Sequence, residues 1–117
     1  MSIKLFPACN KTLIAQRSTK EFRFPKHSPR YPNNANCEWL IVNYYHGTEL
    51  ALRFVHFDVE NGYDFVTVYA DGVLQERLTG NATNGTTFWA RRNMRIVFTS
   101  DNIVNKTGFR AIYRASM

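Results

Sequence analysis

The sequence contains no apolar run near the ~18 residues that a membrane-spanning helix needs, so we expect no membrane insertion. It also lacks any long segment with a helical stripe of apolar side chains. Internal repeats, low-complexity tracts and interdomain linkers are absent too. These absences predict a single domain over residues 1–117, with its folded core at about residues 9–114.

Acidic residues are scarce, because nine Asp and Glu stand against 15 Lys and Arg, which gives a net charge of +6. This charge permits anionic partners such as sulfated glycans, although solubility alone can explain it. The basic residues are scattered, and only Arg91, Arg92 and Arg95 form a local cluster. We therefore expect no nucleic-acid partner and retain sulfated glycans as an alternative partner.

Cysteines number only two, and Cys9 and Cys37 can be free thiols in the cytosol or one disulfide outside it. Four Asn-x-Thr sequons favour the secretory route and predict glycosylation at Asn10, Asn81, Asn84 and Asn105. Together these features favour a Cys9–Cys37 disulfide, which would stabilise the fold by ~3 kcal/mol in the chain-entropy model. Residues 1–8 are too short for a secretory signal, so we expect a mature or excised domain, either secreted or the extracellular part of a membrane protein.

Apolar and polar residues alternate with a period of two through most of the chain, which is typical of half-buried strands. Turn sequences such as Asn61-Gly62 and Asp71-Gly72 separate the alternating segments. The pattern predicts an all-β fold, an antiparallel sandwich or barrel. The predicted strands lie at residues 21–24, 37–42, 50–54, 65–69, 94–99 and 109–114. We expect the first dozen residues and the last three to be loosely held.

The few acidic residues are unevenly placed. Asp58, Glu60 and Asp64 fall within one seven-residue stretch, and Asp101 follows in a Ser-Asp-Asn segment. If the fold brings the two segments together, the carboxylates repel one another, and a hard cation is the usual remedy. The pattern therefore indicates a site organised by calcium, and it points away from catalysis.

Seven segments, in order, resemble the motifs of the CUB domain family, an extracellular β-sandwich module. They are Cys9, Ser-Pro-Arg-Tyr-Pro at 28–32, Asn-Cys-Glu-Trp-Leu-Ile at 36–41, the apolar strand and its acidic end at 50–60, Tyr-Asp-Phe-Val-Thr-Val-Tyr-Ala-Asp-Gly at 63–72, and the closing strands at 94–101 and 108–113. The resemblance implies a jelly-roll-like antiparallel sandwich and a non-enzymatic module that binds proteins.

Three features depart from the family pattern. Most members have a second disulfide, and Gly62 and Thr79 stand where its cysteines would be. The loop from Glu60 to Asp64 is shorter than in calcium-binding members. The family often has two Tyr-Pro steps where this chain has one, so Tyr31 could correspond to either and receives no ligand role.

The resemblance also implies a calcium site. The ligands would be Glu60, Asp64 and Asp101, with backbone carbonyls near Asn102 or Ile103. Glu60 and Asp101 would face a protein partner and accept its Lys or Arg side chain, while Asp64 would lie deeper. Each acid also has a simpler interpretation. Asp64 can hydrogen-bond within a turn, Glu60 can be a solvated loop residue, and Asp101 can cap its own turn.

Catalytic and zinc chemistry find no support. The three histidines, His27, His46 and His56, have no zinc-ligand spacing and no local nucleophile signature, so we expect no enzyme activity and no catalytic residues. Two alternatives to a calcium-organised protein-binding module remain. One is a glycosaminoglycan- or glycan-binding module that uses its basic surface, and the other is the substrate-recognition domain of a larger modular protease.

The two tryptophans have different expected places. Trp39 lies in an apolar strand next to Cys37 and is expected in the core. Trp89 with Arg91 and Arg92 could form an exposed contact patch, or it could be a strand aromatic beside charged rim residues.

Overall fold

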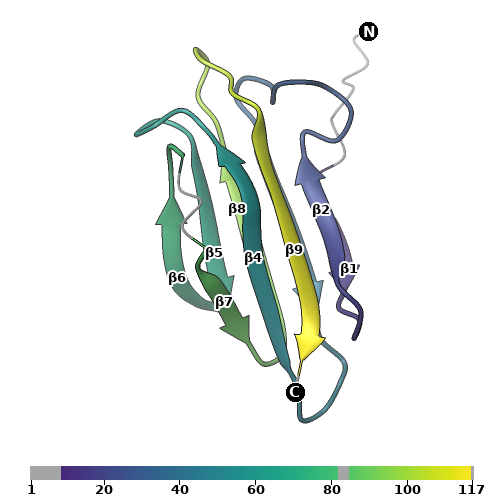
Figure 1. The fold of residues 1–117 in the computed structure, drawn as a ribbon. Coiled ribbons are helices and arrows are strands. Elements are labelled where there is room, and N and C mark those ends of the chain that lie inside the picture. Colours follow the sequence, from purple (N-terminus) through teal and green to yellow (C-terminus); the bar gives the residue numbers. More distant parts are fainter. Residues whose placement is uncertain (1–8, 82–84, 117) are drawn as a thin grey trace, which may run out of the picture.

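A computed structural model describes residues 9–81 and 85–116 of the chain. Two facing β-sheets make up this part of the molecule (Figure 1). Its nine strands are β1 (Lys11–Ile14), β2 (Lys20–Phe24), β3 (Asn36–Val42), β4 (Glu49–Asp58), β5 (Phe65–Ala70), β6 (Val73–Leu78), β7 (Thr87–Ala90), β8 (Asn93–Thr99) and β9 (Gly108–Ser116). The prediction of an all-β sandwich is confirmed, and the described residues form no helix.

The five-stranded sheet has the order β1-β3-β8-β5-β6, and the four-stranded sheet has the order β2-β9-β4-β7. Neighbouring strands pair antiparallel in both sheets, apart from the parallel pair of β1 and β3. All six predicted strands are present. Sequence reasoning missed β1, β6 and β7, and β1 begins inside the stretch that was expected to be loose. The last strand likewise runs to Ser116.

The missed strands share a physical feature, because each lies at the edge of a sheet. Five of the six residues of β6 are exposed, so its sequence shows no apolar alternation. β1 and β7 have only four residues each, which is too short to establish a period of two. Edge strands pair on one side only and need fewer inward apolar side chains than the central strands.

Aromatic residues from both sheets fill the space between them. The indole of Trp39 lies 5.4 Å from the ring of Phe24 and 5.4 Å from that of Phe109, measured between ring centroids. Trp39 is 2% exposed, as expected for a core residue. Fully burying a large apolar side chain of this kind contributes ~1.5–3 kcal/mol. At the edge of the core, a disulfide joins Cys9 to Cys37 at the start of β3, with Cα atoms 5.2 Å apart.

One end of the sandwich gathers the loops that follow β2, β4 and β8, which meet at the upper edge of Figure 1. Backbone hydrogen bonds tie these loops together, from Tyr31 N to Lys106 O (3.2 Å) and from Asn34 N to Asp101 O (2.8 Å). Gly108, with φ of 90°, allows β9 to start against the end of β2, because a Cβ there would collide with the carbonyl oxygen of Phe24. The acidic segments therefore converge at this end.

Candidate metal centre

Three carboxylates converge between the loops at this end. Glu60 and Asp64 belong to the connection between β4 and β5, and Asp101 belongs to the connection between β8 and β9. One oxygen from each lies within 4.8 Å of the others. Asp58, the fourth acid of the predicted cluster, is not part of this group. It ends β4, and its Oδ2 accepts a hydrogen bond from the Thr107 hydroxyl (3.4 Å).

Asp64 is the buried member of the group, with 0% exposure. Its Oδ1 accepts a hydrogen bond from the backbone N–H of Asp101 (2.8 Å), and its Oδ2 accepts one from the hydroxyl of Tyr31 (2.5 Å). A buried carboxylate needs such partners, because burial without them costs several kcal/mol. Each oxygen keeps a second lone pair, so Asp64 can still bind a cation.

Tyr31 was left without a role by the sequence, and it proves to be the residue that connects the group. Its hydroxyl donates to Asp64 and accepts from the backbone N–H of Glu60 (3.0 Å). Its ring is buried 4.8 Å from that of Phe98. Burial, and then the hydrogen bond to Asp64, raise the pKa of Tyr31, so its hydroxyl stays a donor. The only sequence signal for this residue was the Ser-Pro-Arg-Tyr-Pro motif.

Glu60 carries the feature that is hardest to explain without a ligand. Its Oε1 atom is shielded from solvent and has no hydrogen-bond partner among the described residues. Desolvation, and then the charges of Asp101 and Asp64, raise the pKa of the Glu60 carboxyl. The charge of Lys106 offsets this rise only in part. A carboxylate oxygen that is hidden from water, repelled by its neighbours and without a hydrogen-bond donor would gain a partner from a bound cation.

Asp101 combines both of the roles considered for it. Its Oδ1 accepts a hydrogen bond from the backbone N–H of Ile103 (3.2 Å), so it does cap its own turn. The same side chain is partly exposed and lies with Glu60 and Asp64 in the cluster. A carboxylate has about four lone-pair sites, so turn capping leaves room for a cation and for a partner's donor.

The short connection from Glu60 to Asp64 does not prevent Glu60 from reaching the cluster. Asp64 N donates to Glu60 O (3.0 Å) to form a tight turn. The hydroxyl of Thr79 lies 3.1 Å from Glu60 O and 2.7 Å from Asp64 O, and it accepts a hydrogen bond from Gly62 N (2.9 Å). The two positions that carry a disulfide in most of the family are thus linked here by a hydrogen bond.

The donor set fits a hard cation. Calcium binds six to eight oxygen atoms at ~2.3–2.6 Å, and this group presents carboxylate oxygens only. Among the described residues no histidine or cysteine joins the group, so its chemistry does not suit zinc. Glu60 and Asp101 are partly exposed while Asp64 is buried, so the group has an outward side that a partner could contact.

The predicted glycosylation sites differ in their surroundings. Asn10 and Asn81 are exposed, and Asn84 lies outside the described residues. Asn105 is partly buried, and its Nδ2 donates to Tyr31 O and to Asn33 Oδ1, both at 2.7 Å. A carbohydrate on Asn105 would disrupt these hydrogen bonds beside the carboxylate group. In the part of the chain that the structure describes, no helix is long and apolar enough to cross a bilayer.

A family model for the CUB domain matches residues 9–113. Among characterised proteins, human Tolloid-like protein 2 is 37% identical over 98 residues, a match that covers 74% of this chain and 9% of that protein. Dog cubilin is 34% identical over 102 residues, covering 79% of this chain and 3% of cubilin. The chain therefore spans less than a tenth of the length of these relatives.

Two solved structures also superpose on this chain. The extracellular region of zebrafish Gpr126/Adgrg6 superposes with a TM-score of 0.81 at 28% identity, covering 92% of this chain and 15% of that one. A MASP-1 CUB2 domain, crystallised with bound Ca²⁺, superposes with a TM-score of 0.77 at 27% identity, covering 92% of this chain and all of that domain.

Proposed function

Because the chain belongs to the CUB domain family, we propose that it is an extracellular protein-binding module whose Glu60, Asp64 and Asp101 hold a calcium ion. CUB domains are non-catalytic modules of extracellular modular proteins. The specific proposal is that the ion fixes the loops at one end of the sandwich, where Glu60 and Asp101 accept a Lys or Arg side chain from a protein partner.

The observation that carries this proposal is the shielded Oε1 atom of Glu60, which has no partner among the described residues. Its neighbours Asp64 and Asp101 add like charge, so neither can satisfy it while all three are ionised. A bound calcium ion would supply positive charge and satisfy the three carboxylates together. The solved MASP-1 CUB2 domain with bound Ca²⁺ adds support by similarity of fold.

The chain's own residues would position the carboxylates and contact the partner. Tyr31 and the backbone N–H of Asp101 hold the buried Asp64 in place. Glu60 and Asp101, both partly exposed, keep lone pairs that can face outward. A lysine or arginine that reaches them would make a charge-assisted hydrogen bond, roughly twice as strong as a neutral one.

Thermal unfolding of the purified chain in excess calcium, in magnesium and after EDTA tests the ion. A ligand that binds only the folded state stabilises it by about 2.7 kcal/mol at one hundred times its Kd, so calcium alone should raise the midpoint. Asp101→Asn should abolish the shift. Asp58→Asn is the matched control, because this acid lies close in sequence but outside the group, and it should keep the shift. An equal midpoint in millimolar calcium and in EDTA would refute the site.

The partner chemistry needs a second measurement. A lysine-rich peptide and its fully acetylated counterpart can be compared by isothermal titration in calcium and in EDTA. The proposal expects binding of the unmodified peptide in calcium only, with loss in Asp101→Asn. Binding that survives EDTA would locate the interaction elsewhere on the domain.

A further inference from the structure

The outer face of the four-stranded sheet carries an exposed tryptophan. Trp89 is 51% exposed, although its neighbours in β7, Phe88 and Ala90, are buried. The strand register places Ala51 of β4 directly between Trp89 of β7 and Arg114 of β9. Because Ala51 has a small side chain, it leaves a gap between the indole of Trp89 and the guanidinium group of Arg114. The side chain of Ala51 gives this gap an apolar floor.

This gap is a hollow of about 300 Å³, and its lining includes Ala51, Arg53, Trp89, Ile112 and Arg114. Arg53 pairs with Ile112 on the next outward-facing row of the same sheet, so two guanidinium groups border an apolar surface. Small-molecule sites combine an apolar lining with a few polar groups that fix orientation, and this hollow has that composition.

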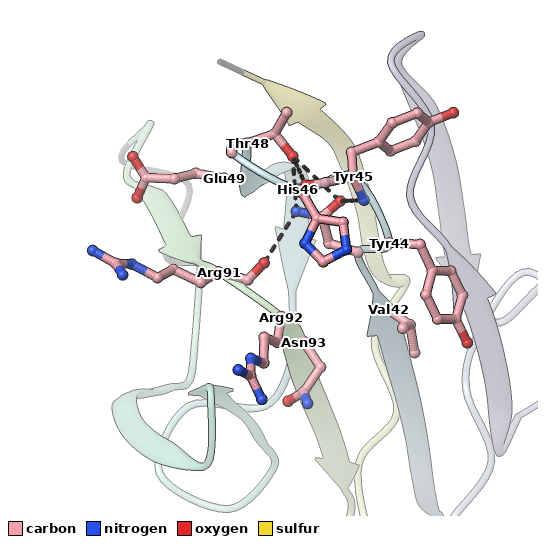
Figure 2. A pocket seen from close by; sticks show the side chains of 11 residues that line it. Val42, Tyr44, Tyr45, His46, Thr48, Glu49, Arg91, Arg92 and Asn93 are labelled. Carbon is pink, nitrogen blue, oxygen red and sulfur yellow. Dashed lines mark hydrogen bonds between the residues drawn. The ribbon is translucent and has the colours of Figure 1, made fainter.

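Two further hollows continue from the first. One of about 270 Å³ shares Arg114 and Ser116 with it and adds Arg17. The next, of about 700 Å³, shares Thr48 with the second and reaches Arg91 and Arg92. Figure 2 shows this last hollow, with the side chains of Arg91 and Arg92 on one side, the rings of Tyr44 and Tyr45 pointing away on the other, and His46 between them. The guanidinium of Arg17 lies 5.4 Å from the ring centroid of Tyr45.

We call this region the arginine surface, and it is defined by Arg17, Arg53, Arg91, Arg92 and Arg114. Glu49 is the one acid among the residues that line the three hollows. Within the described ranges, none of the five arginines forms an ion pair, whereas Arg23, Arg95 and Arg110 pair with Glu21 or Glu38. The Asp71 carboxylate lies beside Arg91 and Arg92, where it accepts their backbone N–H groups and interacts with the charge of Arg92. Arg17, Arg53 and Arg114 therefore supply the least neutralised cationic donors of the arginine surface.

The arginine surface is separate from the carboxylate group. It extends from the middle of β4 and the second half of β9 to the connections β1–β2, β3–β4 and β7–β8, whereas the carboxylates follow the ends of β4 and β8. β4 has 10 residues, and a strand of that length spans about 30 Å. No residue of the carboxylate group lines any of the three hollows.

We propose that the arginine surface binds a linear anionic oligosaccharide, with one sugar ring against Trp89 and its sulfate or carboxylate groups on Arg53 and Arg114. Arginine presents a planar fork that matches sulfate and carboxylate geometry with two hydrogen bonds. The C–H face of a sugar ring can pack on the exposed indole, whose face carries negative electrostatic potential. The adjoining hollows extend the same chemistry to the next sugars of the chain.

A heparin-derived hexasaccharide, titrated into the 117-residue chain by calorimetry at about 0.15 M salt, tests the proposal. Arg53→Gln/Arg114→Gln and Trp89→Ala should each weaken binding by about tenfold or more. Arg23→Gln/Arg110→Gln is the matched control, because it removes the same charge from the same sheet face at a distance from Trp89. It should change the affinity by less than about twofold.

Trp89 also provides a direct readout. Because Trp39 is 2% exposed and Trp89 is 51% exposed, a change in indole fluorescence on adding the hexasaccharide reports on Trp89. The desulfated hexasaccharide should bind weakly or not at all. Equal weakening in the matched control would overturn the proposal in favour of attraction by net charge. Equally tight binding of polyglutamate, or full affinity in folded Trp89→Ala, would overturn the saccharide assignment.

Discussion

A single hydroxyl group, that of Tyr31, holds two of the three clustered acids in position. It donates to Asp64 and accepts from the backbone of Glu60. Removing a group that orients a metal ligand typically lowers the metal affinity by about 10–100-fold. The positions of Asp64 and Glu60 therefore depend on the hydroxyl of Tyr31.

We expect Tyr31→Phe to lower calcium affinity by about tenfold and the free energy of unfolding by about 1–2 kcal/mol, because it leaves buried groups without a partner. Calorimetric titration with calcium and denaturant unfolding measure the two effects. Tyr113→Phe is the matched control, because Tyr113 is a buried tyrosine in β9 away from the carboxylates. Equal calcium affinity in Tyr31→Phe and wild type would contradict this role.

Asp71 is a second residue whose side chain holds a turn in place. It lies in the turn after β5, where its φ is 49°. Its carboxylate accepts hydrogen bonds from the backbone N–H groups of Arg91, Arg92 and Asn93, at 2.8, 2.8 and 3.1 Å. Desolvation alone would raise the pKa of Asp71, but these N–H donors hold it below its ordinary range. The side chain thus fixes the β7–β8 turn to a neighbouring hairpin.

Asp71→Asn should destabilise the domain by about 1 kcal/mol near neutral pH, because the hydrogen bonds lose their charge in an exposed turn. Since the folded pKa lies below the unfolded one, this stability is present above about pH 4 and is lost as the pH falls through the folded pKa. Wild type and variant should therefore converge in urea unfolding experiments at low pH. Asparagine tolerates the positive φ, so a constant difference at every pH would argue against a charge effect.

At the scale of elements, the connection between β4 and β5 depends on a side chain at the end of β6. The Thr79 hydroxyl reaches Gly62 N and the carbonyl oxygens of Glu60 and Asp64. These contacts take the place of a covalent link between the same two positions. A hydrogen bond can break and re-form, so the connection from Glu60 to Asp64 is held in this chain by a weaker and reversible link.

Thr79→Val keeps the shape of the side chain and removes its hydroxyl. We expect a loss of about 1 kcal/mol in unfolding free energy, because partly buried backbone groups lose their hydrogen-bond partner. Faster amide exchange of residues 61–64 and weaker calcium binding should accompany it. Thr67→Val, the same substitution on β5, is the control and should leave the amide exchange of residues 61–64 and the calcium affinity unchanged. Loop exchange that matches wild type would show that the backbone turn alone suffices.

Prediction from the sequence succeeded where the burial pattern was regular. The central strands β3, β5 and β8 alternate between buried and partly buried residues along their length, and each was predicted. Edge strands such as β6 carry no such pattern. The uneven placement of the acids indicated four candidates, including Asp58, and the resemblance to the CUB family selected the three that the fold brings together. Tyr31 and Thr79 could not be predicted, because a hydroxyl acquires its role from backbone groups that only the folded chain brings near.

At the scale of the whole molecule, two charged groups lie apart on the sandwich. Glu60, Asp64 and Asp101 gather at one end, whereas the arginine surface extends from the middle of β4 toward the other. Electrostatic interactions between exposed charges decay over about 8 Å at physiological salt. The two ends should therefore act as separate electrostatic sites.

We expect hexasaccharide affinity to change by less than about twofold between calcium and EDTA, because the sites are separated by more than one screening length. Asp101→Asn should leave saccharide binding intact, and Arg53→Gln/Arg114→Gln should leave the calcium-induced rise in the unfolding midpoint intact. Calorimetry with both ligands added in either order measures any coupling. A tenfold change in one affinity caused by the other ligand would mean that the two ends communicate.

The disulfide of Cys9 and Cys37 also decides how the domain would respond to mechanical tension. Cys9 is joined to the start of β3, while Ser116 pairs with Glu49 at the opposite end of the sandwich. Tension between these ends loads β3 and β9 along their axes, whereas β1 and β2 lie inside the closed loop and carry none. In single-molecule pulling, reducing the bridge over its 28-residue separation should release about 90 Å of additional contour length.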